Sequence, residues 1–146
     1  MTRYVVDASV IIQALIAQSY TTEATALVAS IPQTNQIHIP EFCLLECANV
    51  LWKQVRFQKI LKVDAAQLLL DLLDLPLVSV PVLNLLPTAL EIGLAHQLAV
   101  YDSLYIALAL SLNCPLVTVD DRQLQAAIAQ NTAIALITDF SAVSPG

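Results

Sequence analysis

Four acidic residues of this sequence stand in settings from which carboxylates could act together in one site. They are Asp7, Glu46, Asp102 and Asp120. Asp7 and Asp120 each follow a short apolar stretch directly, and Asp102 precedes a longer one. Because Asp is a preferred N-cap, each of these three could simply cap a helix. Glu46 differs, since it lies inside an apolar stretch, where a carboxylate loses water unless a cation or hydrogen-bond donors meet it.

Carboxylates that converge without Lys or Arg nearby repel one another, and a hard divalent ion that prefers oxygen ligands removes this repulsion. The chemistry natural to such a site is phosphodiester cleavage. One or two Mg²⁺ or Mn²⁺ ions then polarise the phosphate, activate a water and stabilise the departing oxygen, so that no histidine, lysine or cysteine base is required. The residues alone leave open both this chemistry and a structural set of helix caps.

The elements that would position these acids alternate short apolar strands with helices. The expected strands are residues 4–6, 36–39, 77–80, 116–119 and 133–137. The expected helices are residues 8–17, 22–30, 41–57, 63–75, 87–98, 102–112 and 121–129. Pro40 is expected in the first turn of the third helix, and Asp64 and Asp102 as N-caps of the fourth and sixth. This alternation predicts a parallel sheet covered on both faces, in which ligands bind beyond the carboxyl ends of the strands, where Asp7 and Asp120 stand.

Composition favours one compact cytoplasmic domain over residues 1–146. With 58% hydrophobic and 12% charged residues, disorder is not expected. Asp7 interrupts the first apolar stretch, which argues against a signal peptide. Residues 103–119 carry no charge, but Asn113 and Pro115 break them, and a spanning helix needs about 20 apolar residues, so no membrane contact is expected. The odd number of cysteines, three, indicates reduced core thiols.

The net charge of −6 argues against a polyanionic partner, because affinity for nucleic acid rests largely on Lys and Arg. Bound divalent cations would reverse the sign of an acidic site and weaken this objection. Four of the six basic residues also gather in one short stretch, at Lys53, Arg56, Lys59 and Lys62. This stretch is either a solvated helix end or a contact for an RNA backbone.

Four short motifs hold the four acids, in order, along nearly the whole chain. They are residues 6–9 (VDAS), 44–51 (LLECANVL), 101–109 (YDSLYIALA) and 115–120 (PLVTVD). Together these motifs resemble PIN-domain proteins, specifically the VapC-like toxin ribonucleases of type II toxin–antitoxin systems. A lone VDAS motif would carry little information, whereas four acids in the family's order and local settings are specific.

This resemblance implies a three-layer α/β sandwich with a central parallel sheet of four or five strands and helices on both faces. It also implies a metal-dependent endoribonuclease. Asp7, Glu46 and Asp102 match the family's metal-site acids for Mg²⁺ or Mn²⁺, and Asp120 matches its fourth acid. Ser9 would hydrogen-bond within the pocket or act as an ordinary helix cap. The implied partners are an RNA substrate, a second copy in a homodimer and a cognate antitoxin.

The sequence leaves one alternative function open and fits another poorly. A catalytically weak or inactive PIN fold that binds RNA or a protein partner is the alternative, motivated by the charge of −6 and the apolar composition. A receiver or phosphatase domain fits poorly. A receiver would need a phosphorylatable Asp at the end of a later strand and a lysine after a further strand, and neither appears. The sequence also contains no Gly-rich phosphate loop. Gly93 and Gly146 are the only glycines in the sequence.

Overall fold

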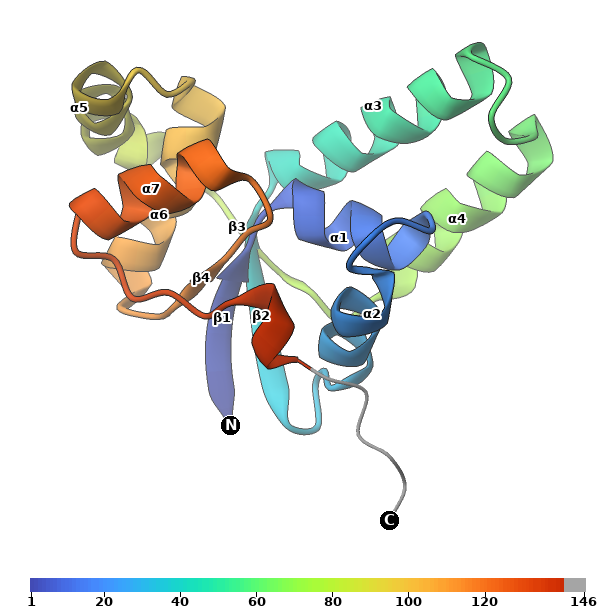
Figure 1. The fold of residues 1–146 in the computed structure, drawn as a ribbon, viewed down its shortest axis with the longest axis horizontal. Coiled ribbons are helices and arrows are strands. Elements are labelled where there is room, and N and C mark those ends of the chain that lie inside the picture. Colours follow the sequence, from blue (N-terminus) through green and yellow to red (C-terminus); the bar gives the residue numbers. More distant parts are fainter. Residues whose placement is uncertain (141–146) are drawn as a thin grey trace.

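A central parallel sheet separates two layers of helices in the computed structural model, which describes residues 1–140 (Figure 1). The strands are β1 (Thr2–Val6), β2 (Asn35–Pro40), β3 (Val78–Val80) and β4 (Leu116–Val117). Their order in the sheet is β3-β2-β1-β4, and all three neighbouring pairs are parallel. The predicted three-layer α/β fold with a parallel sheet is therefore confirmed.

Seven α-helices and two short 3₁₀ turns complete the described part of the chain. They are α1 (Ala8–Leu15), α2 (Thr21–Ala29), α3 (Phe42–Arg56), α4 (Lys62–Asp74), η1 (Leu83–Leu85), α5 (Leu86–His96), α6 (Val100–Leu112), α7 (Asp121–Ala129) and η2 (Ile137–Asp139). In Figure 1, α5, α6 and α7 lie to the left of the strands, and α1 and α2 lie to the right. The helices α3 and α4 form an antiparallel pair that projects away from the sheet, which we call the arm.

The strand order places a topological switch point between β1 and β4. The chain moves from β1 to β2 and β3 on one side, and then crosses to add β4 on the other side of β1. Val5 pairs with both His38 of β2 and Leu116 of β4, so β1 is central and its inner residues are fully buried. In open parallel sheets the crevice for ligands forms where the strand order reverses. Here that position is the carboxyl end of β1 and β4.

The uncharged segment 103–119 is explained by the position of α6 in the core. Residues 103–109 of α6 are all buried. Gly93 allows α5 to pack closely against the start of α6 and the turn before it. A Cβ atom at position 93 would lie 2.6 Å from the backbone oxygen of Leu98. Within the described residues, no single helix is long and apolar enough to cross a membrane, and the segments 83–96 and 100–112 pass such a test only as a pair bent by 118°.

The roles predicted for Pro40, Asp64 and Asp102 at helix starts are wrong, although the starts themselves differ from the prediction by only one or two residues. Pro40 ends β2 instead of opening a helix, and the next amide, Glu41 N–H, donates to the carbonyl of Val80 at 3.1 Å. Pro40 has no N–H to donate, so the backbone hydrogen bond to β3 at this position comes from the next residue. Asp64 and Asp102 lie in the first turns of α4 and α6 and do not cap them, because each helix begins two residues before its acid. Acids in a first turn still interact favourably with the helix dipole.

Two predicted strands also differ from the structure. Residues 77–80 were expected to form a buried strand, but β3 is an edge strand with one neighbour and is largely exposed. Residues 133–137 form only an isolated bridge, between Ile134 and Leu116. The chain then turns into η2, where Asp139 accepts a hydrogen bond from the amide of Leu136 at 3.0 Å. The sheet of the described residues therefore has four strands.

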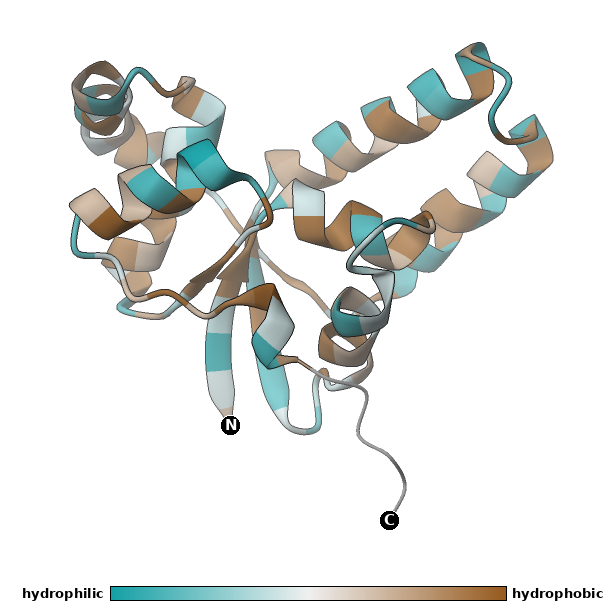
Figure 2. Ribbon diagram, viewed as in Figure 1, coloured by the Kyte–Doolittle hydropathy of each residue, from teal (hydrophilic) through white to brown (hydrophobic). Residues whose placement is uncertain are grey.

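Hydrophobic residues are not confined to the core. Figure 2 shows them along the whole length of α3 and α4, although the arm stands away from the sheet. Large exposed apolar side chains of the arm include Leu45, Trp52, Phe57, Leu70 and Leu73. An apolar surface of this kind is typical of a protein that contacts a partner.

Candidate functional site

All four predicted acids line one cavity of about 460 Å³ at the carboxyl ends of β1 and β4. Asp7 lies between β1 and α1, Glu46 lies in α3, Asp102 lies in the first turn of α6, and Asp120 precedes α7. These residues come from four distant parts of the chain. Ser9 lines the same cavity, and Lys53 is the one basic residue of its lining.

Asp7 is the most buried of the four acids, with only 6% of its surface exposed. Its side chain does not cap α1. Instead, its Oδ1 accepts a hydrogen bond of 2.6 Å from the hydroxyl of Ser9, which in turn accepts one of 3.3 Å from the amide of Val119. Ser9 therefore ties Asp7 to the end of the segment that follows β4 and does not serve as a helix cap.

Burial raises the pKa of Asp7 to about 7, because removal from water penalises the ionised form. Hydrogen bonds from Ser9, Thr118 and Val10 oppose this effect, and the nearby charge of Asp120 adds to it. The ionised form of Asp7 is therefore unfavourable in the folded protein unless a cation lies beside it. Such a perturbed carboxyl in a cavity is a mark of a functional site.

Glu46 is half-buried and is met by a hydrogen-bond donor. The hydroxyl of Tyr105 donates to its Oε1 at 2.7 Å, across 59 positions of the sequence. Burial raises the pKa of Glu46, Asp102 raises it further, and the hydrogen bond from Tyr105 opposes both. The ring of Tyr105 is held edge-on against Phe42 at a centroid distance of 5.4 Å. Tyr105 therefore fixes one oxygen of Glu46 from a rigid position.

Asp102 and Asp120 are joined through Gln123. The buried side-chain amide of Gln123 donates to the backbone oxygen of Asp102 at 3.0 Å. The backbone N–H of Gln123 donates to Oδ1 of Asp120, also at 3.0 Å. Asp120 is thus the N-cap of α7, and it is exposed. Burial raises the pKa of Asp102, the charge of Asp120 adds to this shift, and Arg122 opposes it. Asp120 has both a capping role and a place in the cavity lining.

Two further residues of the site, Tyr105 and Gln123, were not predicted from the sequence. Tyr105 follows Asp102 by three positions in a helix, so the two side chains lie on the same side of α6, and this spacing was a usable signal. Gln123 carried no such signal. Its role follows only from the packing of α7 against α6.

The histidines and cysteines take no part in the cavity. Cys43, Cys47 and Cys114 are free and buried, as predicted for core thiols. A hydrogen bond with Cys43, together with burial, raises the pKa of the Cys47 thiol, which disfavours the thiolate that metals and electrophiles require. His38 lies buried in β2, and His96 contacts Gln130 at 2.9 Å.

The sequence of the whole region matches known proteins. Residues 4–129, which contain all four acids, match the PIN domain family. The chain belongs to the PIN-domain family. A curated relative, ribonuclease VapC3 of Pyrobaculum aerophilum, is 31% identical to this PIN domain over 124 residues, which cover 84% of this chain and 92% of the relative.

Solved structures share the same PIN fold. PAE2754 from Pyrobaculum aerophilum superimposes with a TM-score of 0.72 at 21% identity, covering 94% of this chain and 92% of its own. VapC20 of Mycobacterium tuberculosis, a sarcin–ricin loop cleaving toxin, has a TM-score of 0.66 at 17% identity, with 84% and 94% covered. VapBC2 from Rickettsia felis, bound to a promoter DNA fragment, has a TM-score of 0.66 at 16% identity, with 92% and 98% covered.

The donor chemistry of this PIN domain fits a hard divalent cation. The cavity offers four carboxylates and one hydroxyl, all oxygen ligands of the kind that Mg²⁺ and Mn²⁺ prefer. Within residues 1–140, however, no three acidic, histidine or cysteine side chains already form a metal cluster. The acids share one lining but not one point. Four carboxylates in one lining repel one another, and a divalent cation held by Asp7, Glu46 and Asp102 would offset this repulsion.

Proposed function

We propose that this PIN domain is a metal-dependent endoribonuclease that binds Mg²⁺ or Mn²⁺ through Asp7, Glu46 and Asp102, assisted by Asp120. The observation that carries this proposal is the meeting of four carboxylates in one cavity, with Asp7 almost fully removed from water. The ribonuclease VapC3, 31% identical over most of both chains, supports RNA as the substrate.

When bound, the metal supplies Lewis-acid polarisation of the scissile phosphate and a water of lowered pKa. The chain's own residues prepare the site for it. Ser9 holds one oxygen of Asp7, and Tyr105 holds one oxygen of Glu46, so both carboxylates are oriented before any ion binds. Asp120 uses Oδ1 to cap α7, which leaves its second oxygen available to accept a proton from the attacking water.

Removal of divalent metal is expected to abolish RNA cleavage. Purified protein should cleave unstructured RNA with Mg²⁺ or Mn²⁺ and lose this activity in excess EDTA. In a thermal unfolding assay, an ion at about 100 times its Kd should stabilise the folded protein by about 2.7 kcal/mol. Cleavage that persists in EDTA would contradict the metal mechanism. If neither ion raises Tm, the alternative function, a PIN fold that only binds RNA or protein, is favoured.

The hydrogen bond from Tyr105 predicts that Tyr105→Phe weakens metal binding or cleavage by about 10- to 100-fold, the effect usual for a group that orients a metal ligand. Loss of this bond also raises the pKa of Glu46, so the acidic limb of the pH–rate profile should move to higher pH. Tyr101→Phe is the matched control. Its ring also packs on Phe42, but it is exposed. Equal activity of Tyr105→Phe and wild type at every pH would rule out this role.

We also propose that this protein is a toxin inhibited by a cognate antitoxin, and that it forms a homodimer. The VapBC2 complex, with nearly the whole of its toxin-like fold matched, supports an antitoxin partner. The exposed leucines of the arm, Leu45, Leu70 and Leu73, provide apolar surface for protein contacts. Co-expression with the product of the adjacent gene should give a stable complex with reduced ribonuclease activity, and light scattering should give the mass of a dimer for the free protein.

A further inference from the structure

The free end of the arm carries most of the positive charge of the protein. Lys53 and Arg56 close α3, Lys59 lies in the turn, and Lys62 opens α4. These are four of the six basic residues in a chain of net charge −6, and all four side chains are exposed. Asp64 is the one acid between positions 52 and 64. The free end of the arm is therefore positively charged, although the protein as a whole is acidic.

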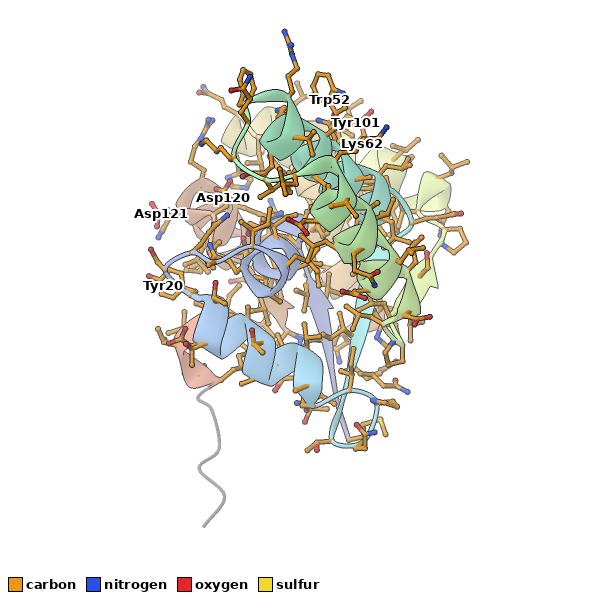
Figure 3. The ribbon with its side chains drawn as sticks, turned by 90° about the vertical axis from the view of Figure 1, so that its right-hand side faces the viewer. Tyr20, Trp52, Lys62, Tyr101, Asp120 and Asp121 are labelled. Carbon is orange, nitrogen blue, oxygen red and sulfur yellow. The ribbon has the colours of Figure 1, made fainter. Side chains whose placement is uncertain are left out.

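Two exposed aromatic rings stand within this positive end. Trp52 is 57% exposed and Phe57 is 64% exposed. The guanidinium carbon of Arg56 lies 6.0 Å from the centroid of the Trp52 ring and 5.7 Å from that of Phe57. Trp52 lies in the last turns of α3 and Lys62 opens α4, so both belong to this end of the arm, which faces the viewer in Figure 3. Exposed rings beside basic side chains are the combination on which single-stranded nucleic acids stack.

One face of α3 connects this end to the acidic cavity. Glu46, Asn49 and Lys53 all line the cavity, and their spacing of three and four residues places them along one side of the helix. Arg56 continues the same row one turn later. At 1.5 Å per residue, Arg56 lies about 15 Å along the helix from Glu46. The row runs without interruption from the acids to the positive end.

We propose that a single strand of RNA engaged at the acidic cavity continues along this face of α3, with phosphates on Lys53 and Arg56 and a base stacked on Trp52 or Phe57. This inference rests on the proposed function and specifies how its substrate is held. The net charge of −6 does not then prevent RNA binding. The strand is held by the basic end of the arm, and the metal site contacts the scissile phosphate. Aromatic and arginine side chains are also common in protein interfaces, but lysine is depleted there, and three of the four basic residues at this end are lysines, which favours RNA as the occupant.

Trp52 is the only tryptophan of the sequence, so its fluorescence reports on this surface directly. The wild-type protein is titrated with an unstructured oligouridylate and, separately, with an RNA duplex, first in EDTA, which blocks cleavage, and then directly after addition of Mg²⁺, which offsets the negative charge of the acidic cavity. We expect saturable quenching with the oligouridylate and a weaker response to the duplex. Quenching that depends on protein concentration without RNA would instead place Trp52 between two copies of the chain and overturn the proposal.

Variants then separate charge from stacking, with binding followed by anisotropy of labelled oligouridylate. Lys53→Gln with Arg56→Gln should lower the slope of log Kobs against log salt by about 1.4, at about 0.7 per phosphate contact. Trp52→Leu should weaken binding by at least about fivefold. Arg3→Gln, a basic exposed residue away from the arm, is the control and should change neither quantity appreciably. Variants that bind like the wild type would overturn the proposal.

Cleavage assays keep this inference distinct from the proposed function. If metal-dependent cleavage is observed but Trp52 fluorescence and the variants show no effect, the ribonuclease proposal stands and the α3 contact is wrong. If the oligouridylate quenches Trp52 and the variants weaken binding, but no RNA is cleaved under any condition, the contact stands and the ribonuclease proposal fails.

Discussion

Asp7→Asn is expected to lower metal-dependent RNA cleavage by about three orders of magnitude. A catalytic metal contributes several kcal/mol of charge stabilisation in the transition state, and each 1.36 kcal/mol corresponds to a factor of ten in rate. Asparagine keeps an oxygen that can accept the hydrogen bond from Ser9 but lacks the negative charge that holds the cation. The measurement is the initial rate of cleavage of unstructured RNA at saturating Mg²⁺ or Mn²⁺.

Asp121→Asn provides the matched control for this variant. Asp121 directly follows Asp120 and is exposed, but it does not line the acidic cavity. Its replacement makes the same change of charge close to the site and should alter the rate by no more than about twofold. Cleavage by Asp7→Asn at the wild-type rate would remove Asp7, and with it the central ligand, from the mechanism.

The stability of the metal-free protein is expected to fall as pH rises towards 7, because of Asp7. Its pKa is about 7 in the folded protein and 3.8 as the ordinary value. Below pH 3.8 the carboxyl is protonated in both states and costs nothing. Between these values the unfolded chain ionises first, so unfolding becomes more favourable, by up to about 4 kcal/mol once the pH exceeds the folded pKa. Urea denaturation in EDTA at a series of pH values measures this loss.

Asp7→Asn should remove the contribution of Asp7 to this pH dependence, so that the variant is more stable than the wild type above pH 7 in EDTA and close to it near pH 4. The raised pKa values of Glu46 and Asp102 lower stability in the same direction, but they are common to both proteins. The difference between the two proteins isolates Asp7. The buried His38 has a lowered pKa, which changes stability in the opposite sense, but it is common to both. Saturating Mg²⁺ should restore the stability of the wild type above pH 7 and leave that of Asp7→Asn nearly unchanged. Parallel pH profiles of the two proteins in EDTA would show that Asp7 is not the group responsible.

The same residue therefore links function and stability. The desolvation that destabilises the folded protein without a cation is the reason that a cation would bind there. A variant that gains stability in EDTA and loses cleavage in Mg²⁺ would display both sides of this relation. Natural sites that carry out chemistry often hold groups that are unfavourable for folding.

The sequence by itself determined the parallel α/β fold and the membership of the site. Apolar stretches ending in Asp7 and Asp120 predict strand ends, and parallel strands bring their carboxyl ends to one edge of the sheet, so both acids could be placed without coordinates. Glu46 was recognisable because a carboxylate within an apolar helix needs a partner. Each of these patterns involves only a few neighbouring residues, so it can be recognised in a single sequence.

Only the tertiary structure decided the partners of these acids. The hydrogen bond from Tyr105 to Glu46 and the two contacts of Gln123 depend on how α6 rotates and how α3 and α7 pack against it. Pro40 ends β2 because the backbone of the next residue, Glu41, pairs with Val80 of β3, and α6 begins before Asp102 because the amide of Ser103 donates to the carbonyl of Ala99. The four basic residues at the end of the arm were evident in the sequence, but the exposure of Trp52 and Phe57 beside Arg56 was not. Packing between distant segments sets all three features, and no short stretch of sequence contains that information.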